Sequence, residues 1–112
     1  MKKIEAILRP ESLSGVRKAL EAIGVSGVTI SEVKGHGAQR GVEKQWRGTA
    51  YAVELLSKVK VETVIPDELL EQALQVIHET ARTGEIGDGK VFVSEIVDVM
   101  RVRTGERGKV AM

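Results

Sequence analysis

The sequence contains no cysteine, and none of its apolar runs approaches the length that crosses a membrane. Without cysteine the chain cannot form a disulfide, a catalytic thiolate or a zinc-thiolate site, and a reducing compartment suits it. Residues 1–5, MKKIE, lack the apolar segment of a signal peptide. We therefore expect a cytoplasmic protein that is not inserted into a membrane.

The chain also lacks a strong excess of either charge, and it has few aromatic residues. Its 17 Lys and Arg against 16 Asp and Glu give a net charge of +1. No general field gathers nucleic acid, so anion recognition would require local clusters of Lys and Arg. The only aromatic residues are Trp46, Tyr51 and Phe92, and two of them lie in the polar stretch QWRGTAY. The length and the 42% hydrophobic content suit one domain, 1–112, with one core.

The first part of the chain carries strand and helix patterns in turn. Residues 2–9 alternate apolar and polar side chains, the period of a strand, and Pro10 ends it. Apolar residues at every third or fourth position predict a helix over 11–23, which Gly24 can terminate. The β-branched stretch 25–34, VSGVTISEVK, predicts a second strand.

A long segment without sustained periodicity follows. Residues 35–55 begin GHGAQRGVEKQWRG and hold four glycines among charged residues. This pattern predicts a long flexible loop or hairpin over about 36–55. An irregular excursion of this length inside a compact domain is more often functional than not.

The second part of the chain repeats the arrangement of the first. Alternation predicts a third strand over 56–65, and Pro66 then starts a second helix that extends to Ala81. Residues 90–99 predict a fourth strand, and 100–112 form a polar, partly ordered tail.

This order predicts an α+β fold, the ferredoxin-like βαββαβ sandwich. It has a four-stranded antiparallel sheet with two helices on one face and the long loop between strands 2 and 3. The other sheet face stays uncovered by helices. Because Ile7 and Phe92 fall on it, we expect it to contact other subunits.

Two segments carry candidate anion-binding chemistry. Residues 84–90 match the G-x-x-x-x-G-K part of a P-loop, but Val91 replaces the magnesium-binding Ser or Thr and the helix precedes the glycines, so a P-loop is rejected. The glycines can still turn N–H groups toward an anion beside Lys90, while a helix cap followed by a tight turn explains them equally well. Arg101 and Arg103 would project from one side of an extended backbone and suit a polyphosphate, although a solvated charged terminus is the simpler interpretation.

No set of side chains predicts catalysis. His36 and His78 are the only histidines, and no second histidine stands at metal-ligand spacing from either. The serines lack the context of a nucleophile elbow. We therefore expect a protein that is not an enzyme.

The fold and five sequence blocks together resemble the PII nitrogen-regulatory signalling proteins. The blocks are 34–37 (KGHG), 46–51 (WRGTAY), 58–60 (KVK), 83–90 (TGEIGDGK) and 101–105 (RVRTG), and the resemblance extends over almost the whole chain. It implies a homotrimer that binds ATP or ADP in each of three clefts between subunits.

The resemblance also implies roles for individual residues. Gln39 would help hold Mg²⁺ on ATP, and the effector 2-oxoglutarate would complete the metal's coordination and contact Gln39, Lys58 and Gly87. Thr29, Gly35 and Val64 would lie near the adenine. The whole ATP or ADP site would consist of Thr29, Gly35, Gly37, Gln39, Val64, Gly87, Asp88, Gly89, Lys90, Arg101 and Arg103.

The implied mechanism is a binding switch in which 2-oxoglutarate, on the Mg-ATP form, reorganises the long loop and ADP favours another conformation. The implied partners are an ammonium transporter and enzymes or regulators of nitrogen assimilation, but no nucleic acid. Tyr51 matches a tyrosine that some relatives nucleotidylate, Thr49 replaces a serine that others phosphorylate, and Trp46 departs from the usual Tyr.

A second class stays open: a stand-alone ferredoxin-like module that binds a small ligand or RNA. RNA binding would require exposed aromatics on central strands and a basic field, and neither is evident in the sequence.

Overall fold

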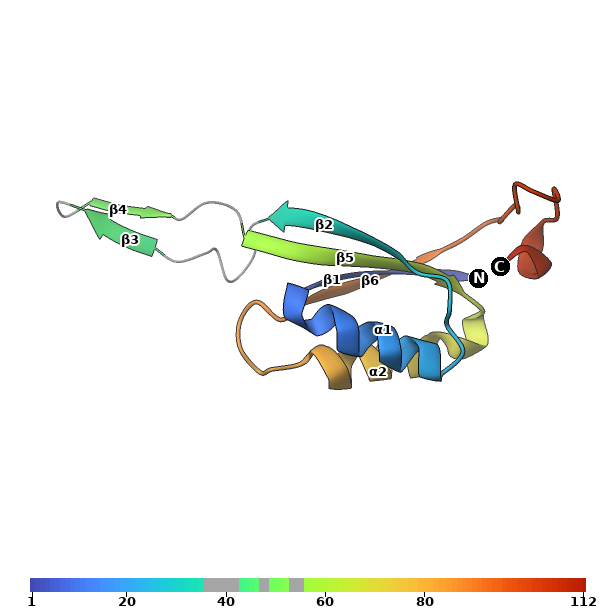
Figure 1. Ribbon diagram of the computed structural model, residues 1–112, viewed down its shortest axis with the longest axis horizontal. Coiled ribbons are helices and arrows are strands. Elements are labelled where there is room, and N and C mark those ends of the chain that lie inside the picture. The colour runs from blue at the N-terminus through green and yellow to red at the C-terminus, as the bar shows by residue number, and fades with distance from the viewer. Residues whose placement is uncertain (36–42, 47–48, 53–55) are drawn as a thin grey trace.

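The computed structural model of the protein describes residues 1–35, 43–46, 49–52 and 56–112, and for 43–46 and 49–52 it describes the backbone alone. Four strands form an antiparallel sheet in the order β2-β5-β1-β6. Figure 1 shows both helices on one face of this sheet. This is the predicted ferredoxin-like arrangement. The strands are β1 (Lys2–Leu8), β2 (Thr29–Gly35), β5 (Leu56–Ile65) and β6 (Gly89–Glu95).

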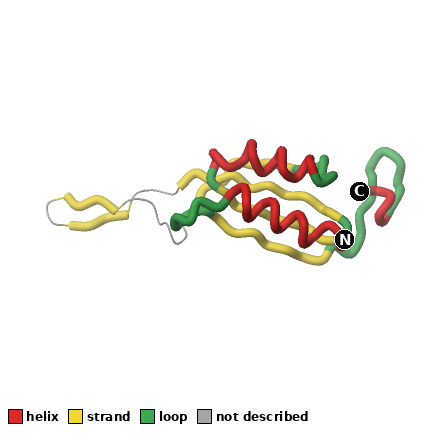
Figure 2. The backbone as a smooth tube through the Cα atoms, turned by 90° about the horizontal axis from the view of Figure 1, so that it is seen from below, coloured by secondary structure: helices red, strands yellow, loops and turns green. Residues whose placement is uncertain are grey.

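The two α-helices are shorter than the predicted helical segments because each follows a separate 3₁₀ turn. α1 (Leu13–Ala22) follows η1 (Pro10–Ser12), and α2 (Leu70–Ala81) follows η2 (Asp67–Leu69). The helices lie side by side across the sheet (Figure 2). They approach closely at Gly15 on α1, where a Cβ atom would lie 2.9 Å from the Thr80 methyl group on α2.

The core fills the space between the sheet and the helices. Alternate residues of β1 and β5 point into it, as their sequence period predicts. Its largest fully buried side chains are Ile4, Val16, Leu20, Val61, Ile65 and Ile77.

The second and fourth strands are shorter than predicted. The predicted strand 25–34 begins only at Thr29, because the preceding residues close the turn after α1: the Val25 N–H donates to the Leu20 carbonyl over 2.9 Å. The predicted strand 90–99 ends at Glu95, because its partner β1 begins at Lys2, the residue opposite Glu95. A strand extends only as far as its neighbour offers hydrogen bonds.

The segment predicted as a long loop or hairpin contains a hairpin. β3 (Glu43–Trp46) pairs with β4 (Thr49–Ala52), with Trp46 opposite Thr49. Figure 1 shows this hairpin beyond the end of the sheet where β2 ends and β5 begins.

The polar tail lies at the opposite end of the sheet (Figures 1 and 2). It doubles back so that Met100 bridges to Arg107, and it ends in η3 (Gly108–Ala111).

Candidate functional site

A cavity of about 560 Å³ opens on the sheet face that the helices leave uncovered. Ile7 of β1 lies in its floor, and the residues paired with Ile7 on the two neighbouring strands are Lys60 and Lys90. Paired residues point to the same face of a sheet, so both lysines and Ile7 share the cavity side. Lys58 and Phe92 also line it, and Phe92 is 55% exposed. Lys34 is a fourth lysine in the lining, so the cavity combines an apolar floor with four lysines.

The turn between α2 and β6 forms one wall of this cavity. Gly87 and Gly89 line the cavity and have φ angles of 103° and 111°, which residues with a side chain rarely adopt. At Gly89 the constraint is also steric, because a Cβ atom would lie 1.8 Å from the Ile7 carbonyl oxygen. The glycines thus allow the turn to lie directly against β1.

The Asp88 carboxylate holds this turn together. Its Oδ2 accepts hydrogen bonds from the Thr83 N–H over 2.8 Å and from the Gly84 N–H over 2.9 Å, while the Thr83 hydroxyl donates to Oδ1. The Thr83 hydroxyl and amide, then the Gly84 amide and the Arg9 side chain, hold the pKa of Asp88 well below its usual range. The predicted nucleotide contact Asp88 therefore binds its own turn through its side chain.

Two cations bind carbonyl groups of the same turn. Arg9 Nη2 donates to the Ile86 carbonyl over 2.8 Å, and Arg9 Nε donates to Asp88 Oδ1 over 3.3 Å. Lys58 Nζ donates to the Gly87 carbonyl over 2.8 Å. Burial, and then the neighbouring Arg9 charge, lower the pKa of Lys58.

Arg9 and Thr83 were missing from the sequence-based site. Arg9 lies 79 positions from Asp88, so no local pattern connects the two residues. The only sequence signal was the spacing of Thr83 and Asp88 around two glycines, which is typical of a turn closed by side chains.

A second cavity, of about 410 Å³, lies further along the same sheet face. Two of the three residues expected near the adenine, Thr29 and Val64, line it, whereas Gly35 lines the first cavity. Lys58 and Val64 are six residues apart on β5, a separation of roughly 20 Å in a strand. The expected adenine contacts are therefore divided between two sites within one chain.

The connection before β2 is fixed beside this second cavity by a buried threonine. The Thr63 side chain is buried, and its hydroxyl donates to the Gly27 carbonyl over 2.6 Å. Nearby charges on the open face neutralise each other: Lys3 lies 3.0 Å from Glu5 and 3.2 Å from Glu62. Lys60 lies 3.3 Å from Glu62.

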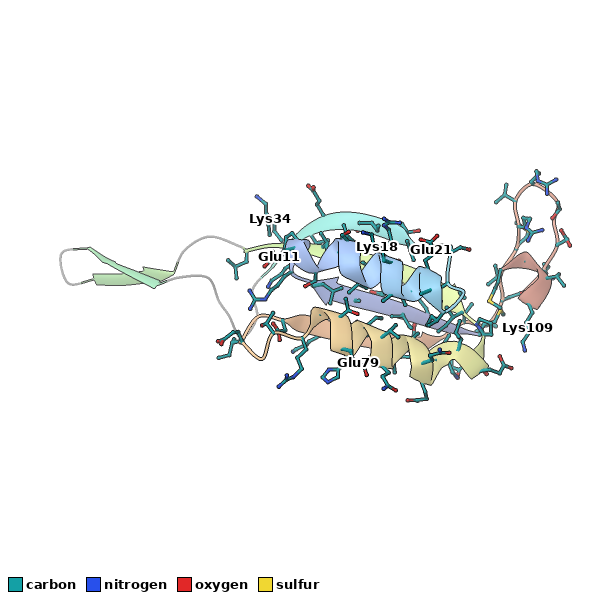
Figure 3. The ribbon with its side chains drawn as sticks, turned by 60° about the horizontal axis from the view of Figure 1, so that its bottom comes forward. Glu11, Lys18, Glu21, Lys34, Glu79 and Lys109 are labelled. Atoms are coloured by element: carbon teal, nitrogen blue, oxygen red, sulfur yellow. The ribbon has the colours of Figure 1, made fainter. Side chains whose placement is uncertain are left out.

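The expectation that Arg101 and Arg103 project from one side of an extended backbone is wrong. Residues 102–104 form a turn, closed by the Gly105 N–H, which donates to the Arg101 carbonyl over 2.8 Å. Arg101 donates to the Glu106 carboxylate and to the Val110 carbonyl, each over 3.0 Å. Neither arginine lines either cavity. Figure 3 shows that the tail and the hairpin lie at opposite ends of the sheet, with Lys34 near the hairpin end and Lys109 in the tail.

Four of the predicted residues are not placed by the structure. Gly37 and Gln39 lie outside the described residues, and for Thr49 and Tyr51 only the backbone, in β4, is described. Within the described part of the chain, no group of His, Asp or Glu side chains is arranged to hold a metal ion. No helix among the described residues has the length and apolarity to cross a membrane.

The comparisons with known proteins agree with this architecture. The family model described as "Nitrogen regulatory protein P-II" matches residues 1–106. The chain belongs to the P-II family. The resemblance inferred from the five sequence blocks is thereby confirmed.

Individual P-II proteins are similar to the chain over nearly its full length. It is 50% identical over 112 residues to nitrogen regulatory protein P-II 1 of Methanothermobacter thermautotrophicus, covering 100% of this chain and 97% of the relative. It is 51% identical to nitrogen regulatory protein P-II of Haemophilus influenzae, with 100% of both chains covered. A crystal structure of Arabidopsis thaliana PII bound to citrate superposes with a TM-score of 0.81 at 44% identity, over 99% of this chain and 91% of that one. The named relatives are regulatory proteins rather than enzymes.

Proposed function

We propose that this P-II protein is a cytoplasmic homotrimer that binds ATP or ADP and 2-oxoglutarate in clefts between its subunits. Mg²⁺ accompanies ATP, with Gln39 as its ligand from the protein. Through segment 36–55 the trimer controls an ammonium transporter or enzymes and regulators of nitrogen assimilation. The protein acts as a binding switch without a catalytic step.

The cavity beside the glycine turn is the observation that carries this proposal. Lys58, Lys60 and Lys90 line it, and because Lys60 is paired with Glu62, an anion would find positive charge from Lys58 on β5 and Lys90 on β6. A glycine turn can also direct backbone N–H groups toward phosphate oxygens. Gly87, Gly89 and Lys90 are the phosphate contacts we propose, and Lys58 would contact a carboxylate of 2-oxoglutarate.

The division of the expected nucleotide contacts supports a site between subunits. Lys90 is the second residue of β6, whereas Arg101 and Arg103 lie in the tail beyond the other end of the sheet. One chain therefore supplies a turn at one end and arginines at the other. In a closed ring of identical subunits, the tail of one subunit can complete the turn of the next.

Titration calorimetry with and without nucleotide tests the ligand assignment. We expect 2-oxoglutarate to bind only when Mg-ATP is present. Equal affinity without nucleotide would contradict the proposal and favour a stand-alone small-ligand module. Absence of ATP binding would contradict it outright.

A complementation experiment tests the placement between subunits. Lys90→Ala and Arg103→Ala should each weaken ATP binding, because each removes a charge from the proposed cleft. Mixed trimers, formed by refolding the two variants together, should recover native affinity in about a quarter of the clefts, namely those with a native turn and a native tail. Each variant refolded alone is the control, and no recovery in the mixture would place the two residues in one chain's site.

Modification of the hairpin is a separate proposal. Tyr51 would be the site of nucleotidylation, and Thr49 a weaker candidate for phosphorylation. Intact-mass measurement of protein from nitrogen-starved native cells should show the adduct, and an unmodified mass would contradict this proposal.

A further inference from the structure

Arg9 connects the end of β1 to the glycine turn through a forked contact. One arm of its guanidinium donates to the Ile86 carbonyl, and Nε donates to the Asp88 carboxylate. Both side chains are largely withdrawn from solvent, with 18% of Arg9 and 24% of Asp88 exposed. Asp88 in turn accepts hydrogen bonds from Thr83 and Gly84 at the start of the turn. A single pair of side chains therefore links both halves of the turn to the sheet.

These contacts fix the orientation of a backbone that would otherwise be free. A segment with three positive-φ glycines, Gly84, Gly87 and Gly89, has many accessible conformations. In a trans peptide the C=O and N–H groups point in opposite directions. Because Arg9 holds the Ile86 carbonyl, the N–H of Gly87 in the same peptide must point away from Arg9. Lys58 fixes the next peptide in the same way, through the Gly87 carbonyl.

We propose that Arg9 and Asp88 are positioning residues that preorganise the glycine turn for an anionic ligand, without themselves contacting it. This inference rests on the proposed nucleotide site and revises it, because Asp88 leaves the set of nucleotide contacts. The negative charge of the Asp88 carboxylate would repel a nearby phosphate if it were not neutralised. Here Arg9 neutralises it. The two residues act as one unit, since removal of either side chain leaves the charge of the other without its ion-pair partner.

A double-mutant cycle on ATP affinity tests this unit. The variants are Arg9→Met, which keeps the aliphatic stem, Asp88→Asn, which is isosteric, and the combination of both. Each single change should weaken ATP binding by about tenfold, the equivalent of one charged hydrogen bond. The ATP affinity of the double variant should be no lower than that of the single variant with the lower affinity, because either single change already removes the contact between Arg9 and Asp88. Arg9→Lys should recover only part of the affinity, because an ammonium cannot reproduce the fork.

Two further measurements separate positioning from general stability and from direct contact. Amide hydrogen exchange should accelerate in residues 83–90 of each variant and stay unchanged in α1 and α2. The loss of affinity should be larger for ATP than for adenosine, because adenosine has no phosphate for the turn to contact. Arg17→Met is the matched control: Arg17 lies 3.8 Å from Glu21 on α1, away from the turn, and its loss should change neither measurement.

Several outcomes would overturn the inference. Native ATP affinity in both single variants would do so, as would fully additive losses, which indicate independent contacts with the ligand. Unchanged exchange in 83–90 would show that the pair does not order the turn. If the native protein binds no ATP, the proposed function fails instead, and hydrogen exchange still decides whether Arg9 and Asp88 hold the turn.

Discussion

Replacing Gly89 with alanine should destabilise the protein strongly, and three glycines allow the causes to be separated. Gly89 combines a φ of 111° with a backbone carbonyl 1.8 Å from the position of an added Cβ. Gly24 has a comparable φ of 98° but no atom within 4 Å of that position. Gly27 is equally open, and its φ lies outside the positive range. Alanine at Gly27 therefore introduces neither effect, alanine at Gly24 introduces backbone strain, and alanine at Gly89 introduces backbone strain and a steric clash.

The expected magnitudes follow from these two terms. Alanine at Gly27 should change the free energy of unfolding by less than about 0.5 kcal/mol, as at an ordinary surface site. At Gly24 the strained backbone should cost about 1 to 3 kcal/mol. At Gly89 the displacement of β6 from β1 adds roughly 1 to 3 kcal/mol, giving a total of about 2 to 6 kcal/mol. That total corresponds to a decrease in Tm of roughly 8 to 25 °C for a chain of this size.

Chemical denaturation at one fixed protein concentration measures the series, since the stability of an oligomer depends on concentration. The order of destabilisation should be Gly27, then Gly24, then Gly89. Equal losses at Gly24 and Gly89 would refute the reasoning, because they would show that the approach of the turn to Ile7 carries no steric constraint. Native stability of the Gly89 variant would refute both terms.

Three further predictions concern other parts of the site. Lys58→Met should weaken 2-oxoglutarate binding in the presence of Mg-ATP by about tenfold or more, because a charged hydrogen bond is lost; calorimetry measures it, and unchanged affinity would place the effector elsewhere. Thr63→Val should cost about 1 to 3 kcal/mol of unfolding free energy, because it leaves the Gly27 carbonyl without its hydroxyl donor; denaturation without nucleotide measures it, and a neutral result would contradict it. Because folding lowers the pKa of Asp88, its contribution to stability is present above the unfolded value near 4 and is lost as pH falls below it. Asp88→Asn should therefore differ from the native protein near pH 7 and approach it at low pH in pH-dependent denaturation curves, and a pH-independent difference would contradict this.

The periodic elements could be predicted from sequence because their pattern is local. Alternation over 56–65 matched β5 at both ends, since every second residue from Val59 to Ile65 is buried. The ends of β2 and β6 could not be predicted in the same way. β6 ends where its partner β1 begins, and that information lies tens of residues away in the sequence. β2 begins late because the residues before it close the turn after α1.

The candidate site likewise contains features that depend on local sequence and features that depend on tertiary structure. The glycine turn was identified because positive φ angles select glycine residue by residue. Arg9 was missed because its contacts with Ile86 and Asp88 depend on the tertiary arrangement of β1 and the turn. The side-by-side placement of Arg101 and Arg103 failed for a related reason: it assumed an extended backbone, and the bridge between Met100 and Arg107 instead folds the tail on itself.

The charges on the open sheet face show why a net charge of +1 says little about the ligand. At one end, Lys3, Lys60, Glu5 and Glu62 form a chain of ion pairs that cancels its own field. At the other end, the Asp88 carboxylate is occupied by Arg9 and the turn, while Lys58 and Lys90 line the cavity. Positive potential is thus concentrated beside the glycine turn, although the chain as a whole is nearly neutral. An anion would be drawn to that end because of how the charges are paired rather than how many there are.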